Sequence, residues 1–521
     1  MATLSLAGCG SGGGSGDGGR AIVVGTTDTF QMSKDNPAPF DPATGYDIGS
    51  WNIFNNTYQM LLRLPRSGTE PQPEAAKECH FTDSQGEQYR CTLRSGLTFS
   101  NGDKITSEDV KFSIDRMIKI NDPNGPASLL SNVDKVETPD PSTVVFHLTG
   151  PDSTFPFKLS TPAAAIVDGQ AYEATKIHPG YSVIGSGPYE LKSFSAGKSA
   201  VFVKNPHYKG TIKLNNSKIE LRFFTTAKAM QTALTKGDID VMSRTMTPEQ
   251  VSDLSDGSNS QIKLTEAPGT EIRYLVFNTA DPTVKQLAVR KAVANLVDRQ
   301  SLTKDVYQHT TTPLYSMVPQ SITGHTNSFF DAYGDEPNLA RARQYLDSAN
   351  IDTPVPLTLS YTTNHYGEAT KAEFELLKNQ LESGGLFKVT LQGVSDWDAY
   401  KAAYRAHKYQ VFGMGWFPDF PDPDNYLAPF LGKDDFLNLA YVNTRIRDQI
   451  IPSTRQKTQR SSAVQDFEQA QKLIADDVPL LPLWQGKQYI AARSDITGTE
   501  WALNASSTTQ FWELGRGVSA E

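Results

Sequence analysis

Aromatic rings and carboxylates alternate in one stretch of this chain, VFGMGWFPDFPDPDNYLAPF at residues 411–430. A strand-like apolar run with two glycines ends at Trp416, and acids then alternate with prolines: Pro418, Asp419, Pro421, Asp422, Pro423 and Asp424. Proline fixes φ and lacks an N–H donor, so we expect neither a helix nor a central strand beyond Trp416. A rigid loop that places aromatic rings beside a carboxylate suits the capture of a cationic or amine-bearing ligand. A surface loop with solvated aspartates and locally packed rings fits the same spacing.

Motifs for covalent or metal-dependent catalysis are absent from the sequence. It contains no HExxH, GxSxG, CxxC or Walker pattern. The eight histidines are scattered without an i, i+4 pair, and His207 and His365 are predicted to lie in turns or at the surface. Carboxylate pairs such as Asp422 and Asp424 are common in an acidic chain and are weak evidence for acid–base chemistry. We therefore predict neither an enzyme nor a bound cofactor or metal.

Length and charge narrow the class of protein. The chain has 521 residues and a formal net charge of −9. Single hydrophobic cores rarely grow beyond roughly 250–300 residues, so this length predicts several domains. Net acidity argues against nucleic acid as a partner. No apolar run approaches the roughly 20 residues that a membrane-spanning helix requires.

Four residues near the N-terminus, Leu6-Ala7-Gly8-Cys9, look like a bacterial lipobox. In a lipoprotein Cys9 becomes the acylated first residue, and the Gly- and Ser-rich run at 10–19 is a flexible tether. Residues 1–5 lack the charged and apolar regions of a signal peptide, which indicates a late start codon or a cut chain. A chance cysteine in a disordered tail is the alternative.

Cys79 and Cys91 flank a predicted hairpin, KECHFTDSQGEQYRCTL at 77–93. Its register places Phe81 opposite Tyr89 and the two cysteines opposite each other. Directly opposed residues have Cα separations that a disulfide tolerates. Such a bridge would stabilise the fold by about 3 kcal/mol and indicates an oxidising compartment. A zinc-binding pair is the competing interpretation, although no second Cys or His pair lies at ligand spacing.

Predicted strands alternate with predicted helices along the rest of the chain. The expected strands are 21–25, 144–148, a pair within 184–210, 219–224, 239–241, 274–279, 357–361, 389–391 and 478–484. The expected helices include one capped by Thr106 with Asp109 three residues on, and others at 226–235, after 282, and at 339–349, 372–381 and 463–475. This alternation predicts an α/β architecture with partly parallel sheets.

Three segments together resemble the bacterial extracellular solute-binding family 5, the dipeptide, oligopeptide and nickel binders of ABC importers. They are TLRSGLTFSNGDKITSEDVKFSIDRM, IGSGPYELKSF with VKNPHYKG, and LVFNTADPTVKQLAVRKAVANLVDRQSL; GWFPDFPDPDNYL fits the same family. The resemblance implies a two-lobed α/β periplasmic-binding-protein clamshell (class II, cluster C) with an additional inserted domain. By that pattern the chain divides into a lipobox remnant and tether at 1–19, lobe I at 20–55, 181–275 and 485–521, the extra domain at 56–180, and lobe II at 276–484.

The resemblance also implies where a ligand binds. In the family's peptide binders, an aspartate at the position of Asp419 pairs with the α-ammonium of the ligand, and the aromatic residue before it corresponds to Trp416. The backbone of this loop hydrogen-bonds an extended peptide like an added strand. Dipeptide binders carry an arginine for the ligand carboxylate at about the position of Asn364, where this chain has none nearby, which favours longer peptides. The ligand-site candidates are Asp419, Trp416, Phe417, Phe420, Gly415, Thr27, Asp28, Phe30 and Asn364.

These observations predict a lipid-anchored binding protein that delivers oligopeptides to the transmembrane subunits of an ABC permease. It would act outside the cytoplasm as a monomer, held on the membrane through Cys9. Nickel chelates, haem, oligosaccharides and siderophores are alternative ligands for the same fold. A secreted hydrolase that uses the carboxylates of residues 419–424 is the alternative outside this class, and the missing nucleophile and metal motifs argue against it.

Overall fold

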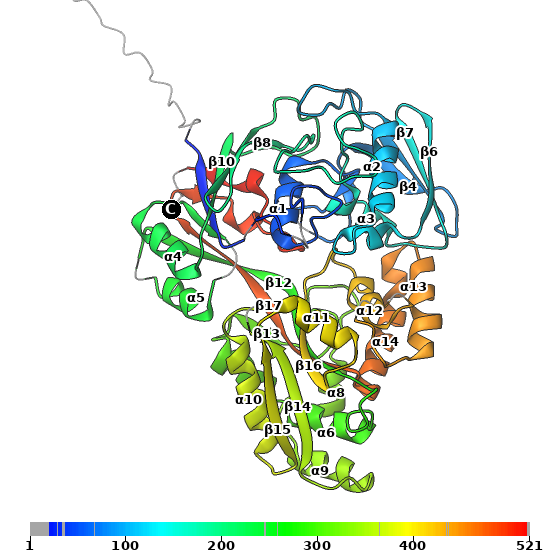
Figure 1. The fold of residues 1–521 in the computed structure, drawn as a ribbon, viewed down its shortest axis with the longest axis vertical. Coiled ribbons are helices and arrows are strands. Elements are labelled where there is room, and N and C mark those ends of the chain that lie inside the picture. Colours follow the sequence, from blue (N-terminus) through cyan, green and yellow to red (C-terminus); the bar gives the residue numbers. More distant parts are fainter. Residues whose placement is uncertain are drawn as a thin grey trace, which may run out of the picture.

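The computed structural model describes residues 20–517, apart from Thr29, 34–36, Ser67, 244–245, Ser258, Asn364, Asp434 and Phe436. The elements form an upper and a lower part, and two long strands, β12 (Ile262–Phe277) and β17 (Leu480–Arg493), run from one part into the other (Figure 1). Within the described ranges, each helix is too short or too polar to span a membrane.

One sheet of eleven strands continues through both parts of the molecule. Its order is β15 (Phe387–Val394), β14 (Val355–Thr362), β16 (Val411–Trp416), β12, β17, β11 (Val241–Ser243), β1 (Ile22–Thr26), β10 (Lys218–Phe223), β9 (Ser199–Lys204) and β8 (Tyr189–Ser195), with β13 (Thr311–Pro313) paired to β17. Strand β1 is parallel to β10 and β11, and β14 is parallel to β15 and β16. The predicted α/β architecture with partly parallel pairing is therefore confirmed.

The long strands β12 and β17 are antiparallel, and their register shifts between Pro268 and Ile272. At this irregularity a Cβ atom on Gly269 would overlap the backbone carbonyl oxygen of Gly486. The two backbones therefore approach more closely than a side chain would permit, which is a common reason for glycine inside a strand.

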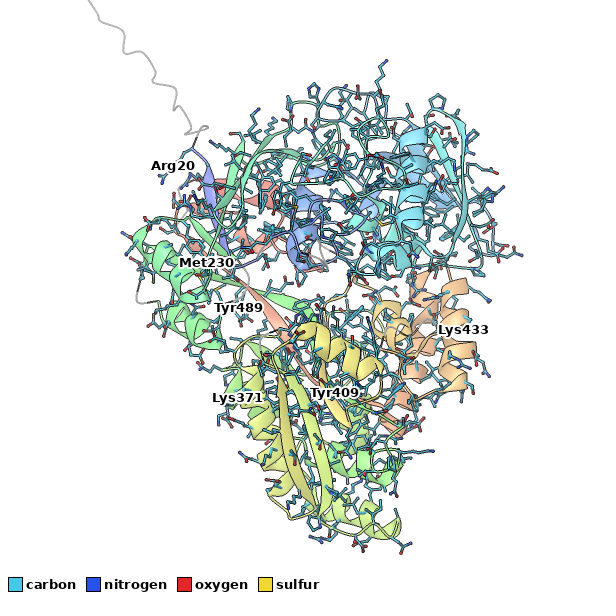
Figure 2. The ribbon with its side chains drawn as sticks, viewed as in Figure 1. Arg20, Met230, Lys371, Tyr409, Lys433 and Tyr489 are labelled. Carbon is cyan, nitrogen blue, oxygen red and sulfur yellow. A yellow bond between two sulfur atoms is a disulfide. The ribbon has the colours of Figure 1, made fainter. Side chains whose placement is uncertain are left out.

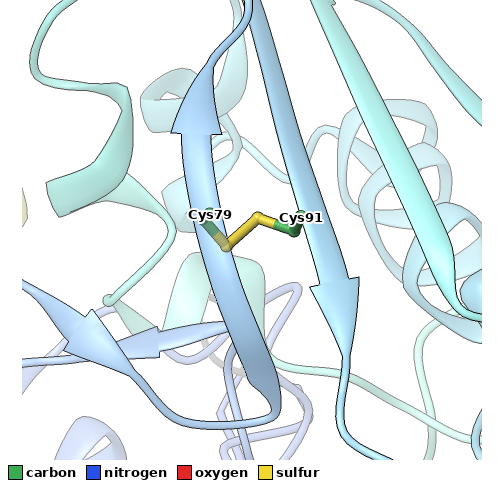
Figure 3. Close-up of a disulfide and its surroundings, with 2 residues drawn as sticks. All are labelled: Cys79 and Cys91. Carbon is green, nitrogen blue, oxygen red and sulfur yellow. A yellow bond between two sulfur atoms is a disulfide. The ribbon is translucent and has the colours of Figure 1, made fainter.

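A smaller antiparallel sheet has the order β4 (Ala76–Phe81), β5 (Gln88–Leu93), β7 (Thr143–Leu148) and β6 (Val133–Asp140). The predicted hairpin register is confirmed, because Phe81 pairs with Tyr89 and Cys79 with Cys91. The two cysteines are joined by a disulfide whose Cα atoms lie 4.1 Å apart (Figure 3). Two short strand pairs complete the set: β2 (Leu62–Arg63) with β3 (Gln72–Pro73), and β18 (Ile496–Thr497) with β19 (Gly515–Arg516).

Helices cover the sheets on both parts of the molecule (Figure 1). They are α1 (Ile48–Thr57), α2 (Ser107–Ile120), α3 (Phe155–Lys158), α4 (Ala227–Lys236), α5 (Pro248–Ser255), α6 (Leu287–Leu296), α7 (Arg299–Ser301), α8 (Ser328–Tyr333), α9 (Leu339–Ser348), α10 (Thr370–Glu382), α11 (Trp397–Arg405), α12 (Asp424–Leu431), α13 (Ile451–Gln456) and α14 (Val464–Asp477). Helix α2 begins as predicted, with the backbone N–H of Thr106 donating to the Asp109 carboxylate at 2.8 Å.

The expectation that no helix follows Trp416 is wrong. After a loop at 417–423, α12 begins at Asp424. Pro423 stands at the N-cap position, where its missing N–H costs nothing because the first N–H groups of a helix have no partner within it. The start of the helix is held by Asp422, whose Oδ1 accepts a hydrogen bond from the backbone N–H of Asp424 at 2.8 Å.

Buried apolar side chains gather in three main clusters. One draws its residues from 272–484, and a second draws on 43–166 around the smaller sheet and α2. The third combines residues of 22–60, 165–241 and 490–514, so it joins the two ends of the described chain. Along the sequence, the chain therefore contributes to the third cluster, then to the second, again to the third, then to the first, and finally to the third once more.

Candidate ligand-binding cleft

A cavity of about 2180 Å³ is lined by segments of both parts of the molecule. The lining draws on residues within 44–51, 121–132, 149–158, 271–273, 305–311, 365–372, 414–433 and 484–489. Tyr489 and Lys433, which belong to it, lie at the level where the two parts meet (Figure 2). Most small-molecule pockets measure roughly 300–1,000 Å³. This cleft therefore has room for a ligand of several residues.

Asp419 lies on the wall of the cleft with 7% of its surface exposed. Its Oδ1 accepts a hydrogen bond from the Tyr46 hydroxyl at 2.8 Å, and its Oδ2 accepts one from the Asn425 side-chain amide at 3.0 Å. Burial raises the pKa of Asp419, and the hydrogen bonds from Asn425 and Tyr46 oppose that shift. The same burial, together with the carboxylate, raises the pKa of Tyr46. Tyr46 therefore remains a neutral donor to this acid.

The surroundings of Asp419 leave its charge without a neighbouring cation. Across the described ranges, no Lys, Arg or His side chain forms an ion pair with this carboxylate. Lys158, whose charge lowers the pKa of Asp419, pairs instead with Asp152 at 2.6 Å. A buried charge of this kind is costly unless a partner is supplied.

The other two acids of the segment 419–424, Asp422 and Asp424, are paired with arginines. Asp422 binds Arg460 through both oxygens at 2.7 Å each, and the two side chains are only 3% and 8% exposed. Asp424 binds Arg455 at 3.0 and 3.1 Å, with the arginine side chain 34% exposed. These pairs fasten the loop and the start of α12 to the end of α13 and the residues after it.

Aromatic rings accompany Asp419 in the lining. Trp416 donates its Nε1–H to Asn425 Oδ1 at 3.1 Å, and the same oxygen accepts the Asp419 backbone N–H at 2.8 Å. Asn425 therefore sets the positions of both the ring and the carboxylate. Phe420 is 1% exposed and packs against Phe157, with ring centroids 5.7 Å apart.

A buried arginine adds a positive charge to the lining. Arg273, on β12, is 7% exposed. Its guanidinium carbon lies 4.0 Å from the ring centroid of Tyr366, 5.1 Å from that of Trp484 and 5.7 Å from that of Phe417. The guanidinium also forms an ion pair with Glu271 of the same strand.

A buried acid holds one of these rings in place. Glu373 accepts a hydrogen bond from the Trp484 Nε1–H at 3.1 Å and another from the Tyr307 hydroxyl. Burial raises the pKa of Glu373, while these hydrogen bonds and the charge of Arg273 lower it. The hydrogen bond to Glu373 therefore holds the Trp484 ring in place, where it contacts Arg273.

The structure brings most of the predicted site residues to one cleft: Asp28, Gly415, Trp416, Phe417, Asp419 and Phe420 all line it. Thr27 lies outside the lining. Phe30 is 4% exposed and packs among core rings, with centroids 5.5 Å from Phe40 and 5.3 Å from Phe223. Asn364 and Cys9 lie outside the described residues.

Sequence reasoning missed three residues that shape the site. Asn425 follows Asp419 by six positions within the quoted motif, so its proximity was visible even though its role was not. Arg273 interrupts an apolar strand with a charge, which is a usable signal because strands rarely bury an arginine without a purpose. Tyr46 is 373 residues from Asp419 in sequence, and no local pattern identifies it.

The arrangement is suited to holding a ligand that carries separated charges. Among the described residues, the cleft offers a carboxylate without an ion-pair partner, an arginine surrounded by rings, and a large volume. No three His, Cys, Asp or Glu side chains in the described part of the chain are grouped as metal ligands. A continuous sheet, two strands joining its halves and a lined cleft between the parts define a two-lobed α/β solute-binding protein.

This chain belongs to the bacterial extracellular solute-binding proteins, family 5, whose model for the middle region matches residues 70–438. The probable D,D-dipeptide-binding periplasmic protein DdpA of Escherichia coli K12 is 24% identical over 483 residues, 89% of each chain. The oligopeptide-binding protein OppA of Bacillus subtilis is 24% identical over an alignment of 525 residues, 92% of each chain. The structure of a dipeptide-binding protein from Pseudoalteromonas sp. SM9913 in complex with Met-Leu matches with a TM-score of 0.77 at 19% identity, over 96% of this chain and 100% of the other. The predicted family and two-lobed fold are therefore confirmed.

Proposed function

We propose that this protein is the extracytoplasmic binding component of an ABC importer and captures oligopeptides by their free amino terminus. The observation that carries the proposal is Asp419, a buried carboxylate on the cleft wall that only neutral groups contact in the described structure. The printed names of the relatives, a D,D-dipeptide-binding and an oligopeptide-binding protein, support a peptide as the ligand.

The α-ammonium of a peptide supplies what Asp419 lacks. It carries a positive charge and three donors, and charge-assisted hydrogen bonds are roughly twice as strong as neutral ones. Burial raises the pKa of the carboxylate, so its ionised form is disfavoured. A bound ammonium favours the ionised form, and this difference is available as binding free energy.

The size of the cleft supports peptides longer than two residues. Its volume of about 2180 Å³ is at least twice the upper end of the usual range for small-molecule sites, roughly 1,000 Å³. The aromatic side chains of Trp416 and Phe417 offer apolar surface for side chains of varied type. A binder of mixed oligopeptides needs such sequence-tolerant contacts beside one fixed charge.

Calorimetry with a free-amine peptide and its N-acetylated form tests the proposal. Removing one member of a desolvated charge pair costs about 2–5 kcal/mol, or roughly 30-fold to several-thousand-fold in affinity. Asp419→Asn should weaken binding of the free amine by this factor, and acetylation should weaken binding to the unchanged protein similarly. Asp122→Asn, which removes a carboxylate elsewhere in the lining, is the matched control and should keep the affinity. An N-acetylated peptide that binds as tightly as its parent would remove Asp419 from this role.

Mass spectrometry of a peptide pool after incubation separates binding from hydrolysis. We expect unchanged peptides to be retained on the protein. Cleavage products that accumulate with time, and that are absent from a sample without protein, would contradict the proposal.

We also propose that Cys9 is acylated in a full-length precursor and anchors the protein on the outer face of the membrane, beside its permease. The lipobox-like Leu6-Ala7-Gly8-Cys9 and the following Gly- and Ser-rich run support this. Cys9→Ser should release the protein into the soluble fraction. Continued membrane attachment of that variant would count against the anchor.

The three apolar clusters support the proposed division of the chain. Lobe II at 276–484 corresponds closely to the cluster of 272–484, and the extra domain at 56–180 to the cluster of 43–166. The remaining cluster combines the three stretches proposed for lobe I, which begin near 20, 181 and 485.

A further inference from the structure

Arg273 stands in the cleft in a way that differs from the other cations of the lining. Its guanidinium is enclosed by three rings, those of Tyr366, Trp484 and Phe417, at 4.0 to 5.7 Å. By contrast, the side chains of Arg455 and Lys487 are 34% and 25% exposed, whereas that of Arg273 is 8% exposed. Rings exclude water from Arg273 and contribute cation–π attraction, so its position is fixed before a ligand arrives.

The neighbouring strand is shaped to admit this side chain. Arg273 of β12 pairs with Gly415 of β16, and a Cβ atom at 415 would overlap Arg273 Nη1. A larger residue at 415 would displace the guanidinium from the wall. Gly415 therefore acts here by leaving room for the arginine.

The donors of Arg273 are only partly used inside the protein. A guanidinium carries five N–H donors. In the described structure, its polar contacts are the ion pair with Glu271 and a hydrogen bond from Nη1 to the Ile272 carbonyl at 3.3 Å. Glu271 is itself 22% exposed at the side chain, so the pair lies at the surface of the cleft. Donors therefore remain for a group that enters from the cleft side.

We propose that Arg273 receives a carboxylate of the bound ligand, while Glu271 holds the opposite edge of the guanidinium. This rests on the proposed function, because the same ligand places its ammonium on Asp419. The planar fork of arginine matches a carboxylate through two parallel hydrogen bonds, and a lysine does not. The cleft thus carries one site for each charge of a zwitterionic or acidic peptide. The carboxylate comes either from the C-terminus or from an acidic side chain, and the experiment distinguishes the two.

The test uses an equimolar pool of free-amine tetrapeptides in four forms, with mass spectrometry of what the protein retains. Two forms have neutral side chains and end in a carboxylate or an amide; the other two end in an amide and carry Glu or Gln at one position. We expect the unchanged protein to retain the carboxylate member of one pair over its neutral partner by about 30-fold or more. A preference within the first pair assigns the C-terminus, and a preference within the second assigns an acidic side chain.

Variants connect that preference to Arg273. Arg273→Gln should retain both members of the pair nearly equally, and so should Arg273→Gln combined with Glu271→Gln, which leaves no acid stranded in the wall. Lys487→Gln removes a cation from the cleft edge and should keep the preference, which excludes a general effect of charge. Thermal unfolding of each variant shows that the fold is intact.

Two results would overturn the proposal: no preference in either pair for the unchanged protein, or a preference that survives in both Arg273 variants. Failure of the proposed function looks different, because the protein would then retain no tetrapeptide of the pool, or would retain a second pool of the same tetrapeptides in N-acetylated form equally well.

Discussion

Three aspartates of the segment 419–424 have different surroundings, and these surroundings indicate different roles. Asp419 faces neutral donors in the cleft wall, whereas Asp422 and Asp424 face arginines. Spacing in the sequence cannot separate them, because each of the three directly follows a proline. The residues that separate them, Arg455 and Arg460, lie more than thirty positions further along the chain.

Asp422 is expected to matter for stability and not for ligand choice. Breaking a buried, hydrogen-bonded ion pair costs about 3–5 kcal/mol, because the partner is left uncompensated. Asp422→Asn should therefore lower the free energy of unfolding by about that amount, measured by denaturant titration. Asp424→Asn should cost less, because Arg455 can turn to solvent while Arg460 cannot. An unchanged stability, or a changed order of peptide preference, would argue against this assignment.

The raised pKa of Asp419 predicts a specific dependence of affinity on pH. Burial is the main cause of the shift, and it disfavours the ionised form in the free protein. Because the folded-state pKa lies above the unfolded value, the contribution of this group to stability is present at low pH and lost as pH rises through the raised pKa. A ligand ammonium reverses the preference, so binding expels the proton.

Affinity for a free-amine peptide should therefore fall as the pH is lowered through the raised pKa of Asp419, within the range below about pH 7 where the peptide amine is charged. The N-acetylated peptide should show no such trend. Calorimetry in buffers of different ionisation enthalpy would also detect the released proton. A free-amine affinity that rises on acidification would contradict the prediction.

At the scale of elements, local sequence patterns predicted which strands exist better than they predicted how long those strands are. Runs of apolar residues identified segments 274–279 and 478–484 as strands. The structure extends them to β12 and β17, of 16 and 14 residues. The missed portion of β12, residues 262–273, includes KLTEAPGTE at 263–271, with a proline, a glycine and two acids that oppose strand formation locally. Pairing with β12 along nearly the whole length of β17 overrides that local preference. No pattern in a single sequence predicts this pairing.

The irregular point between those two strands should be sensitive to a single methyl group. At residue 269 an added Cβ would overlap the Gly486 carbonyl oxygen, and backbone atoms cannot move aside as a flexible side chain can. Overpacking of this kind typically costs about 1–3 kcal/mol, which we expect for Gly269→Ala in denaturant unfolding. Gly150→Ala is the matched control, because a Cβ there meets nothing within 4 Å. If the two substitutions lowered the free energy of unfolding equally, the close approach of the two backbones would not be the reason that residue 269 is a glycine.

At the scale of the molecule, the sequence motifs predicted the family and the fold class, both of which the comparisons confirm. They predicted half of the site, because Asp419 and its rings belong to one continuous stretch. The other half comes from segments that are distant in sequence: Tyr46 lies just before α1, and Arg273 lies on β12. Folding brings these residues together through the shared sheet. An interpretation that takes the sequence one segment at a time cannot detect that they are close in space.

One contact joins the two sides of the cleft away from the ligand residues. The loop before α3 meets the end of α13 through Ser153, whose Oγ accepts from Arg460 Nη1 at 2.6 Å and donates to the Thr454 carbonyl at 3.1 Å. Its backbone N–H donates to the Arg455 carbonyl at 2.8 Å. A hinge motion that opens the cleft has to pivot at this contact or break it.

We expect the proposed lobes to close on a peptide, and Ser153 to influence that equilibrium without touching the ligand. A ligand that binds only the closed form raises stability by about 2.7 kcal/mol at a hundredfold excess over Kd, and small-angle scattering should show compaction under the same conditions. Ser153→Ala removes the hydrogen bond from the charged Arg460, worth about 1.5–3 kcal/mol, together with the neutral one to the Thr454 carbonyl. If the contact belongs to the closed form, the variant should bind peptide more weakly, because the competent population falls. If the contact is the pivot, affinity should hold while unfolding becomes easier. A peptide that raises the melting temperature without any compaction would argue against closure itself.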